Sequence, residues 1–179
     1  MTYCIRTLVP MRRLFLLIWA FAALLRLAPA AAEPAPQTLA FQDFFVHSSG
    51  PHGLALSPTL LAADGQRVTL KGYMVQQERA ALGHFMLTPR PIQMSEQADG
   101  DADDLPLAWA MVYLDPEQEN CAIPHSRGLL EITGVLHVGR DEGPDGRVSW
   151  VRLQLPAEAT RGMNAFEVAT YLHSLQHLH

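Results

Sequence analysis

Two segments of the chain repeat one pattern, in which a glycine stands where strand alternation calls for an inward side chain. Residues 68–74 read VTLKGYM and residues 130–136 read LEITGVL, with Gly72 and Gly134 at the same place in each. Alternating apolar and polar residues predict a half-buried strand in both segments. Glycine in a strand permits a sharp bend or the close approach of another backbone. Because a small barrel closes only through sharply bent strands, the pattern favours a curled sheet over a flat one.

Three further segments are predicted strands, and they complete a mainly β fold. They are residues 84–88 (HFMLT), 107–114 (LAWAMVYL) and 147–155 (RVSWVRLQL). The last of them returns antiparallel to the strand at 129–138 through a glycine-rich turn. Five mostly antiparallel strands fit a small barrel of the oligonucleotide/oligosaccharide-binding (OB) type. The expected fold is therefore an OB-like antiparallel barrel over residues 41–156.

A short helix is expected before the barrel and another after it. Ser57, followed by proline, has the pattern of an N-terminal cap. Asn164 and Glu167 have capping-box spacing and predict a helix in the C-terminal tail, residues 157–179. One face of that helix is apolar, with Val168, Tyr171, Leu172 and Leu175.

The N-terminal 32 residues have the layout of a cleavable secretory signal peptide. Two arginines precede an apolar run of 12 residues, Leu14–Leu25, and small residues follow the run. As a helix, the run spans only about 18 Å of the roughly 30 Å hydrocarbon core of a bilayer. We therefore expect a periplasmic or secreted protein without stable membrane insertion, starting at Met1 or Met11. Residues 33–40, with two prolines, are expected to be a flexible lead-in.

The charge of the chain argues against a nucleic-acid partner. Residues 1–32 hold four of the 13 basic residues and none of the 18 acidic ones, which leaves a formal charge of −9 in the rest of the chain. A surface with this excess of acids repels both nucleic acid and anionic lipid. The expected partner is an envelope protein, an oligosaccharide or another small ligand.

The strand segments resemble exported bacterial proteins of unknown function that are predicted to form OB-like small barrels. The stretches that carry the resemblance lie within residues 41–155 and read GQRVTLKGYMV, HFMLT, LAWAMVYL, GLLEITGVLHVG and GRVSWVRLQL. The resemblance implies a strand layout and is silent on activity. Some such proteins carry a Cys-x-His-Pro-rich segment after the second strand. The matching stretch here, TPRPIQMSEQ, has neither cysteine nor histidine, so the resemblance implies no metal or cofactor.

The motifs of common enzyme classes are absent from the sequence. It contains no G-x-S-x-G, H-E-x-x-H, P-loop or G-x-G-x-x-G. We therefore expect a non-enzymatic binding or accessory module without a cofactor. OB barrels bind ligands on their second and third strands and the adjacent loops, and aromatic side chains are frequent at binding surfaces. The candidate ligand-binding residues are Tyr73, His84, Phe85, Arg90, Trp109 and Trp150, although the rings could equally fill the core.

The alternative hypothesis is a metal-handling accessory protein of the envelope that binds copper or zinc. Soft sulfur together with imidazole suits these ions, and the candidate ligands are His84, Met86, Cys121 and His125. Methionines at strand positions are equally explained as gap-filling core residues. The acidic segment at 95–104 has Asp-x-Asp-x-Asp spacing but departs from a calcium loop at positions six and twelve, so a solvated loop is expected.

Overall fold

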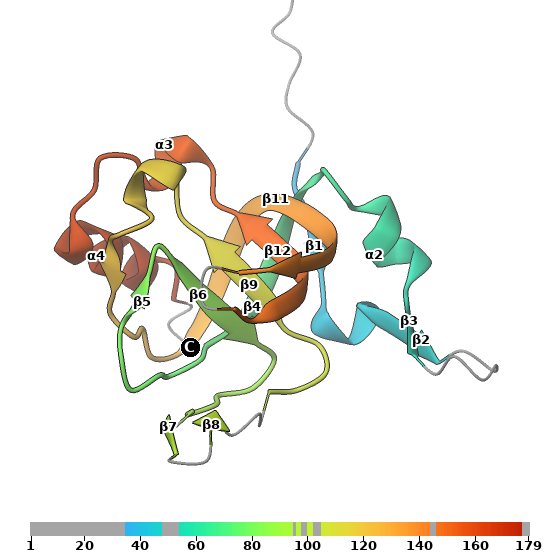
Figure 1. Cartoon of the computed structure of the whole chain (residues 1–179). Coiled ribbons are helices and arrows are strands. Elements are labelled where there is room, and N and C mark those ends of the chain that lie inside the picture. The colour runs from blue at the N-terminus through green and yellow to red at the C-terminus, as the bar shows by residue number, and fades with distance from the viewer. Residues whose placement is uncertain are drawn as a thin grey trace, which may run out of the picture. The chain divides into compact units, whose positions relative to one another are not determined.

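Five strands form a closed ring of hydrogen-bonded neighbours in the computed structural model (Figure 1). Around the ring they are β4 (Arg67–Met74), β11 (Leu129–Glu142), β12 (Val148–Gln154), β9 (Ala110–Tyr113) and β6 (His84–Thr88), which pairs again with β4. Four of the five pairings are antiparallel, and the pairing of β9 with β12 is parallel. The protein is therefore mainly β, as the alternation predicted.

The structure describes residues 35–47, 54–94, 96–97, 100–101, 105–143 and 146–176. The expected signal peptide and most of the acidic segment lie outside these residues. Within the described part of the chain, no helix is both long enough and apolar enough to cross a membrane.

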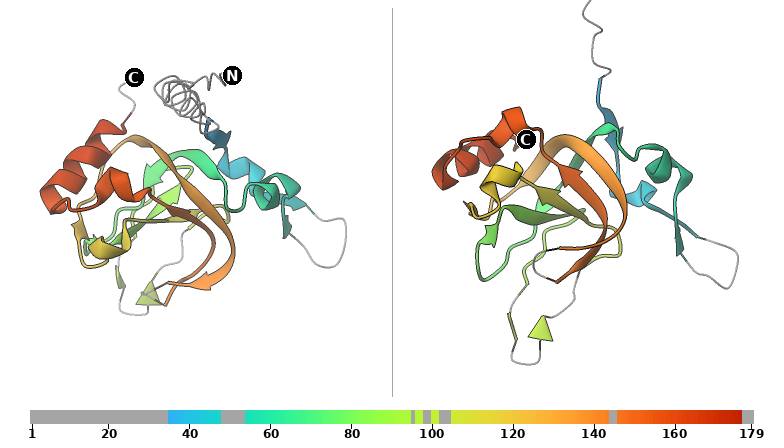
Figure 2. Two further views of the ribbon diagram at one scale, coloured as in Figure 1. Left: turned by 90° about the horizontal axis from the view of Figure 1, so that it is seen from above. Right: turned by 45° about the horizontal axis from the view of Figure 1, so that its top comes forward.

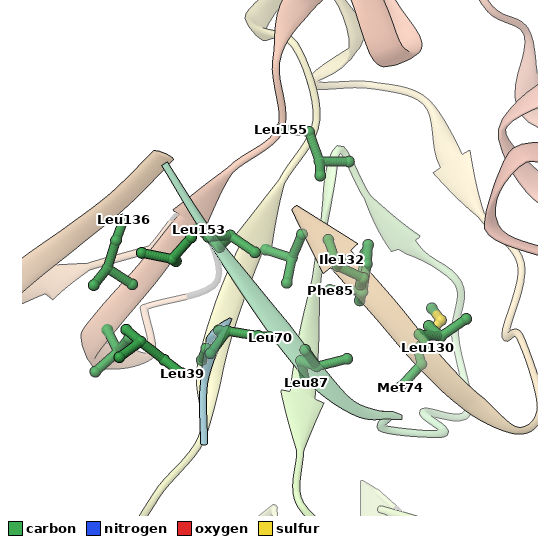
Figure 3. Close-up of a cluster of buried hydrophobic side chains, with 14 of the residues drawn as sticks. Leu39, Leu70, Met74, Phe85, Leu87, Leu130, Ile132, Leu136, Leu153 and Leu155 are labelled. Atoms are coloured by element: carbon green, nitrogen blue, oxygen red, sulfur yellow. The ribbon is translucent and has the colours of Figure 1, made fainter. Parts of the chain in front are cut away.

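Inward side chains of all five strands fill the ring with a single apolar core (Figure 3). Burial alternates along β11 and β12 as the sequence pattern predicts, with every second side chain facing inward. Figure 3 labels core side chains from β4, β6, β11 and β12 and from residues outside the ring strands: Leu39, Leu70, Met74, Phe85, Leu87, Leu130, Ile132, Leu136, Leu153 and Leu155.

Gly72 lies where β4 changes its pairing partner, and Gly134 lies where β11 changes its own. β4 pairs with β11 up to Tyr73 and with β6 from Tyr73 onward, while β11 leaves β4 and joins β12 at Val135. A Cβ atom on Gly72 would lie 2.8 Å from the carbonyl oxygen of Thr88, and one on Gly134 would lie 2.5 Å from that of Gln154. Both positions therefore admit only glycine, because a backbone atom occupies the space of the side chain.

Residues 33–40 contain a strand and are not only the flexible lead-in that their prolines suggested. β1 (Gln37–Leu39) pairs parallel to β4, and the side chain of Leu39 is buried in the core. The strand is held in place because it ends in Leu39, and burial of one leucine stabilises a fold by about 1.5–3 kcal/mol. The strand expected at 107–114 is also shorter than predicted, because hydrogen bonding of β9 begins only at Ala110.

Short elements surround the ring. Before β4 lie a 3-10 helix (Phe41–Asp43), the hairpin of β2 (Phe45–His47) and β3 (Leu54–Leu56), and α2 (Pro58–Ala62). The hydroxyl of Ser57 caps α2 by accepting a hydrogen bond from the amide of Leu60 at 3.0 Å, as predicted. These elements lie on one side of the ring in both views of Figure 2.

The C-terminal helices lie on the opposite side of the ring in both views of Figure 2. They are α3 (Ala157–Thr160) and α4 (Ala165–Ser174), and α4 has the predicted capping box. A second 3-10 helix (Pro116–Gln118) follows β9. Two small two-stranded sheets remain, formed by β5 (Ala81–Leu82) with β10 (Ala122–Ile123) and by β7 (Glu96–Gln97) with β8 (Gly100–Asp101).

We expect Gly134→Ala to destabilise the protein by about 1–3 kcal/mol, the usual cost of overpacking a dense core. The added methyl group would press on the backbone of β12, which cannot move without breaking the pairing of β11 with β12. The free energy of unfolding from denaturant titration measures the effect. His137→Ala, at an exposed position on the same strand, should stay within about 0.5 kcal/mol of the parent protein. Equal stabilities of the two variants would contradict the role of Gly134.

Burial raises the pKa of Tyr171 on α4 above its ordinary value of 10.0. The fold therefore favours the neutral phenol, and this contribution to stability is complete below about pH 10. It is lost as the pH rises through the higher value of the folded state. Tyr171→Phe should consequently reduce the alkaline loss of stability, measured as the free energy of unfolding between pH 8 and 11. Identical pH profiles for parent and variant would contradict this expectation.

Candidate functional site

A groove of about 500 Å³ opens where β4 passes from β11 to β6. Three stretches of chain far apart in the sequence line it: the end of β4 with Gln76, the segment after β6, and the segment before β11. The lining residues are Tyr73, Met74, Gln76, Pro91, Ile92, Gln93, His125, Ser126, Arg127 and Gly128.

The first wall of the groove is a short parallel pairing between the residues after β4 and those after β6. The amide of Gln76 donates to the carbonyl oxygen of Ile92 at 2.9 Å, and the amide of Met94 donates to that of Gln76 at 2.8 Å. The buried hydroxyl of Thr88 lies 2.8 Å from the carbonyl oxygen of Arg90 and 3.2 Å from that of Tyr73. These hydrogen bonds fix the turn between Pro89 and Pro91 to β4.

The second wall is the segment before β11, which is held from two sides. His125 Nε2 lies 3.2 Å from the carbonyl oxygen of Met74, and the amide of Ser126 donates to the Met74 sulfur at 3.4 Å. On the other side, Gln176 Nε2 donates to Ser126 Oγ at 2.7 Å and to the carbonyl oxygen of Arg127. The C-terminal end of α4 therefore positions this wall, because Gln176 follows that helix by two residues.

The lining offers one cationic side chain, Arg127, and neutral polar groups together with apolar surface. Arg127 and His125 are exposed, Tyr73 and Gln76 are half-buried, and the apolar lining residues include Pro91 and Ile92. No aspartate or glutamate is among the lining residues. Small-molecule sites usually combine a few polar groups with a largely apolar surface.

Of the six predicted ligand-binding residues, the structure places only Tyr73 in the groove. Phe85 has 1% of its surface exposed and faces the inside of the ring, so its ring is not offered to a ligand. Arg90 is exposed beside the first wall, and Trp150, 48% exposed, lies on β12. The outer face of β6 and β9 holds the other two, His84 and Trp109.

That outer face, where OB barrels usually bind, is covered by the chain itself. A second buried cluster lies there, made of Val75, Met86, Met94 and Met111. Trp109 packs against it together with Ile92, Leu105 and Tyr113, and His84 lies beside Tyr113 with ring centroids 5.7 Å apart. Side chains from the loop between β6 and β9 thus occupy the surface that the sequence analysis assigned to a ligand.

The four candidate metal ligands occupy different surroundings. Met86 is buried in the second cluster, Cys121 packs against the main core, and His125 lies at the groove. His84 lies on the outer face of β6. Among the residues that the structure describes, no three histidine, cysteine or acidic side chains come together as a metal site. The methionines thus have the gap-filling role that was the competing interpretation.

Sequence analysis missed most of the residues that line the groove. Gln93, Ser126 and Arg127 lie in loops that have no strand period and no motif. Two prolines, Pro91 and Pro124, flank these stretches and indicate ordered loops. The prolines indicate loops, but they do not indicate which loops lie next to each other in the fold.

No family model and no curated protein matches this chain. Among solved structures, the chain is similar to a DUF3299 family protein from Pseudomonas aeruginosa PAO1, at 14% sequence identity and a TM-score of 0.38. The alignment covers 67% of this chain and 92% of that one. A likeness of this degree does not establish a shared fold or function.

We expect Gln176→Ala to loosen the second wall without unfolding the ring. The variant loses both hydrogen bonds from Nε2 to that wall, and one such bond contributes about 1 kcal/mol. Amide hydrogen exchange at Ser126 and Arg127 should therefore become several times faster, while exchange at Ile132 within β11 stays unchanged. Thr170→Ala, whose hydroxyl bonds only within α4, is the matched control. Unchanged exchange at the wall would contradict the positioning role of Gln176.

Proposed function

We propose that the protein is an exported, non-enzymatic binding module of the OB type, which takes a small polar ligand, such as part of an oligosaccharide, in the groove beside Tyr73. Export rests on the pattern of the first 32 residues, and the binding role rests on the groove. The acidic balance of the chain argues against nucleic acid as the ligand.

The order of the strands supports the OB assignment. Counted along the chain, the first strand of the ring (β4) pairs with the second (β6) and the fourth (β11), and the third (β9) runs parallel to the fifth (β12). This order agrees with the Greek-key connectivity expected of a five-stranded OB barrel. The long connection between the third and fourth strands, with its 3-10 helix, also agrees with that plan.

The observation that carries the binding proposal is a groove whose two walls are both fixed by hydrogen bonds. A fixed site loses little conformational entropy when a ligand binds. Tyr73 offers an aromatic face for apolar contact and a hydroxyl for hydrogen bonding, and Gln93 adds an exposed amide. The hydroxyl oxygen of Ser126 accepts a hydrogen bond from Gln176 and so helps to hold the wall of the groove in place.

An NMR titration tests the proposal. A panel of neutral and acidic oligosaccharides is added to the mature protein, and the chemical shifts of its amides report binding. A ligand of this site should shift the amides of residues 73–76, 91–93 and 125–128. Tyr73→Ala should weaken binding at least tenfold, which corresponds to about 1.4 kcal/mol of lost contact.

Trp150→Ala is the control, because this exposed aromatic residue lies outside the groove. It should leave the affinity unchanged. Shifts that cluster around Trp150 on β12, with loss of binding in Trp150→Ala but not in Tyr73→Ala, would show that the site lies elsewhere and overturn the proposal.

A further inference from the structure

The groove has an unusual charge for this chain. Apart from residues 1–32, acidic residues outnumber basic ones two to one, yet the titratable side chains that line the groove are only Tyr73, His125 and Arg127. A concave site that contains the positive charge of Arg127 and no acidic side chain among its lining residues attracts anions, because its field is not cancelled locally.

Among the described residues, three arginines outside the groove pair with a carboxylate, whereas Arg127 makes no such pair. Arg161 lies 3.0 Å from Asp115, Arg152 lies 3.6 Å from Asp141, and Arg67 lies 3.9 Å from Glu158. Within the described ranges, the guanidinium of Arg127 makes no ion pair or hydrogen bond. Its donors are thus available to a ligand.

The backbone that carries Arg127 is held in place. Gln176 donates to the carbonyl oxygen of Arg127 and to the hydroxyl of the residue before it, and His125 is held against Met74. A fixed backbone restricts where the guanidinium can reach and lowers the entropy that a ligand must remove. The planar fork of arginine matches a carboxylate with two parallel hydrogen bonds.

We infer that the ligand carries a carboxylate, which Arg127 binds while the rest of the ligand lies along Tyr73 and Ile92. This rests on the proposed function, because it assigns the ligand class of the same groove. One permanently charged residue matches a monoanion, whereas phosphate sites usually combine several cationic or amide donors. The carboxylate can belong to an acidic sugar or to the C-terminus of a peptide, and the two sources are separated by experiment.

Two matched pairs of probes test the inference on the full-length mature protein. The first pair is the methyl glycoside of galacturonic acid and its uncharged methyl ester, and the second is an acetylated tripeptide with a free C-terminus and the same peptide as its amide. NMR chemical shifts give the dissociation constants. We expect one acid to bind at the groove at least tenfold more tightly than its neutral partner, and the pair that binds identifies the source.

Arg127→Gln should remove that preference, with at least a tenfold loss for the acid, as expected for a charge-assisted hydrogen bond. Arg140→Gln, at an exposed position on β11 outside the groove, should leave it intact. A dispersed spectrum of each variant shows that it has folded.

Equal binding of acid and neutral partner, sensitive to Tyr73→Ala but not to Arg127→Gln, would overturn the carboxylate inference and leave the proposed function standing. Failure of both acids to bind would overturn the inference as well. The proposed function itself fails only if groove amides respond to none of the oligosaccharides and none of the peptides, or if the ligands bind elsewhere.

Discussion

The close approach of backbones at Gly72 and Gly134 is the constraint on which the rest of the structure depends. At these positions β4 and β11 each leave one neighbour and join the next, and a carbonyl oxygen of the adjoining strand occupies the space of a Cβ atom. Without this approach the ring of five strands could not close around its core. Closure also sets the positions of the strand ends from which the walls of the groove start.

The groove is a direct consequence of that closure. It lies beside the partner exchange of β4 just after Gly72, where the chain segments after β6 and before β11 are brought to the same strand end. One wall is fixed to β4 by backbone hydrogen bonds, and the other is fixed by Met74 and by Gln176 beyond α4. Ligand contacts in the groove thus depend on the ring and on the C-terminal helix together.

Alternation and capping predicted much of the fold, while the candidate site was largely unpredictable. The strands, the inward glycines and the caps at Ser57 and Asn164 are local signals, and the structure contains them. Strand alternation cannot tell which outward face stays open. The outer face of β6 and β9 carries Met86 and Met111, and a loop covers it with Met94 and Trp109, so the binding surface expected from the fold class is occupied.

The sequence by itself determined the period of the strands, the place of the two glycines within that period and the apolar face of α4, because each of these is a pattern of neighbours along the chain. Tertiary structure decided which loops meet. Gln176 and Ser126 are 50 residues apart, and Met74 and His125 are 51 residues apart. No local pattern records such pairs. They exist because ring closure brings the end of β4, the start of β11 and the end of α4 to one place, where Arg127 is left with no acidic side chain among the lining residues.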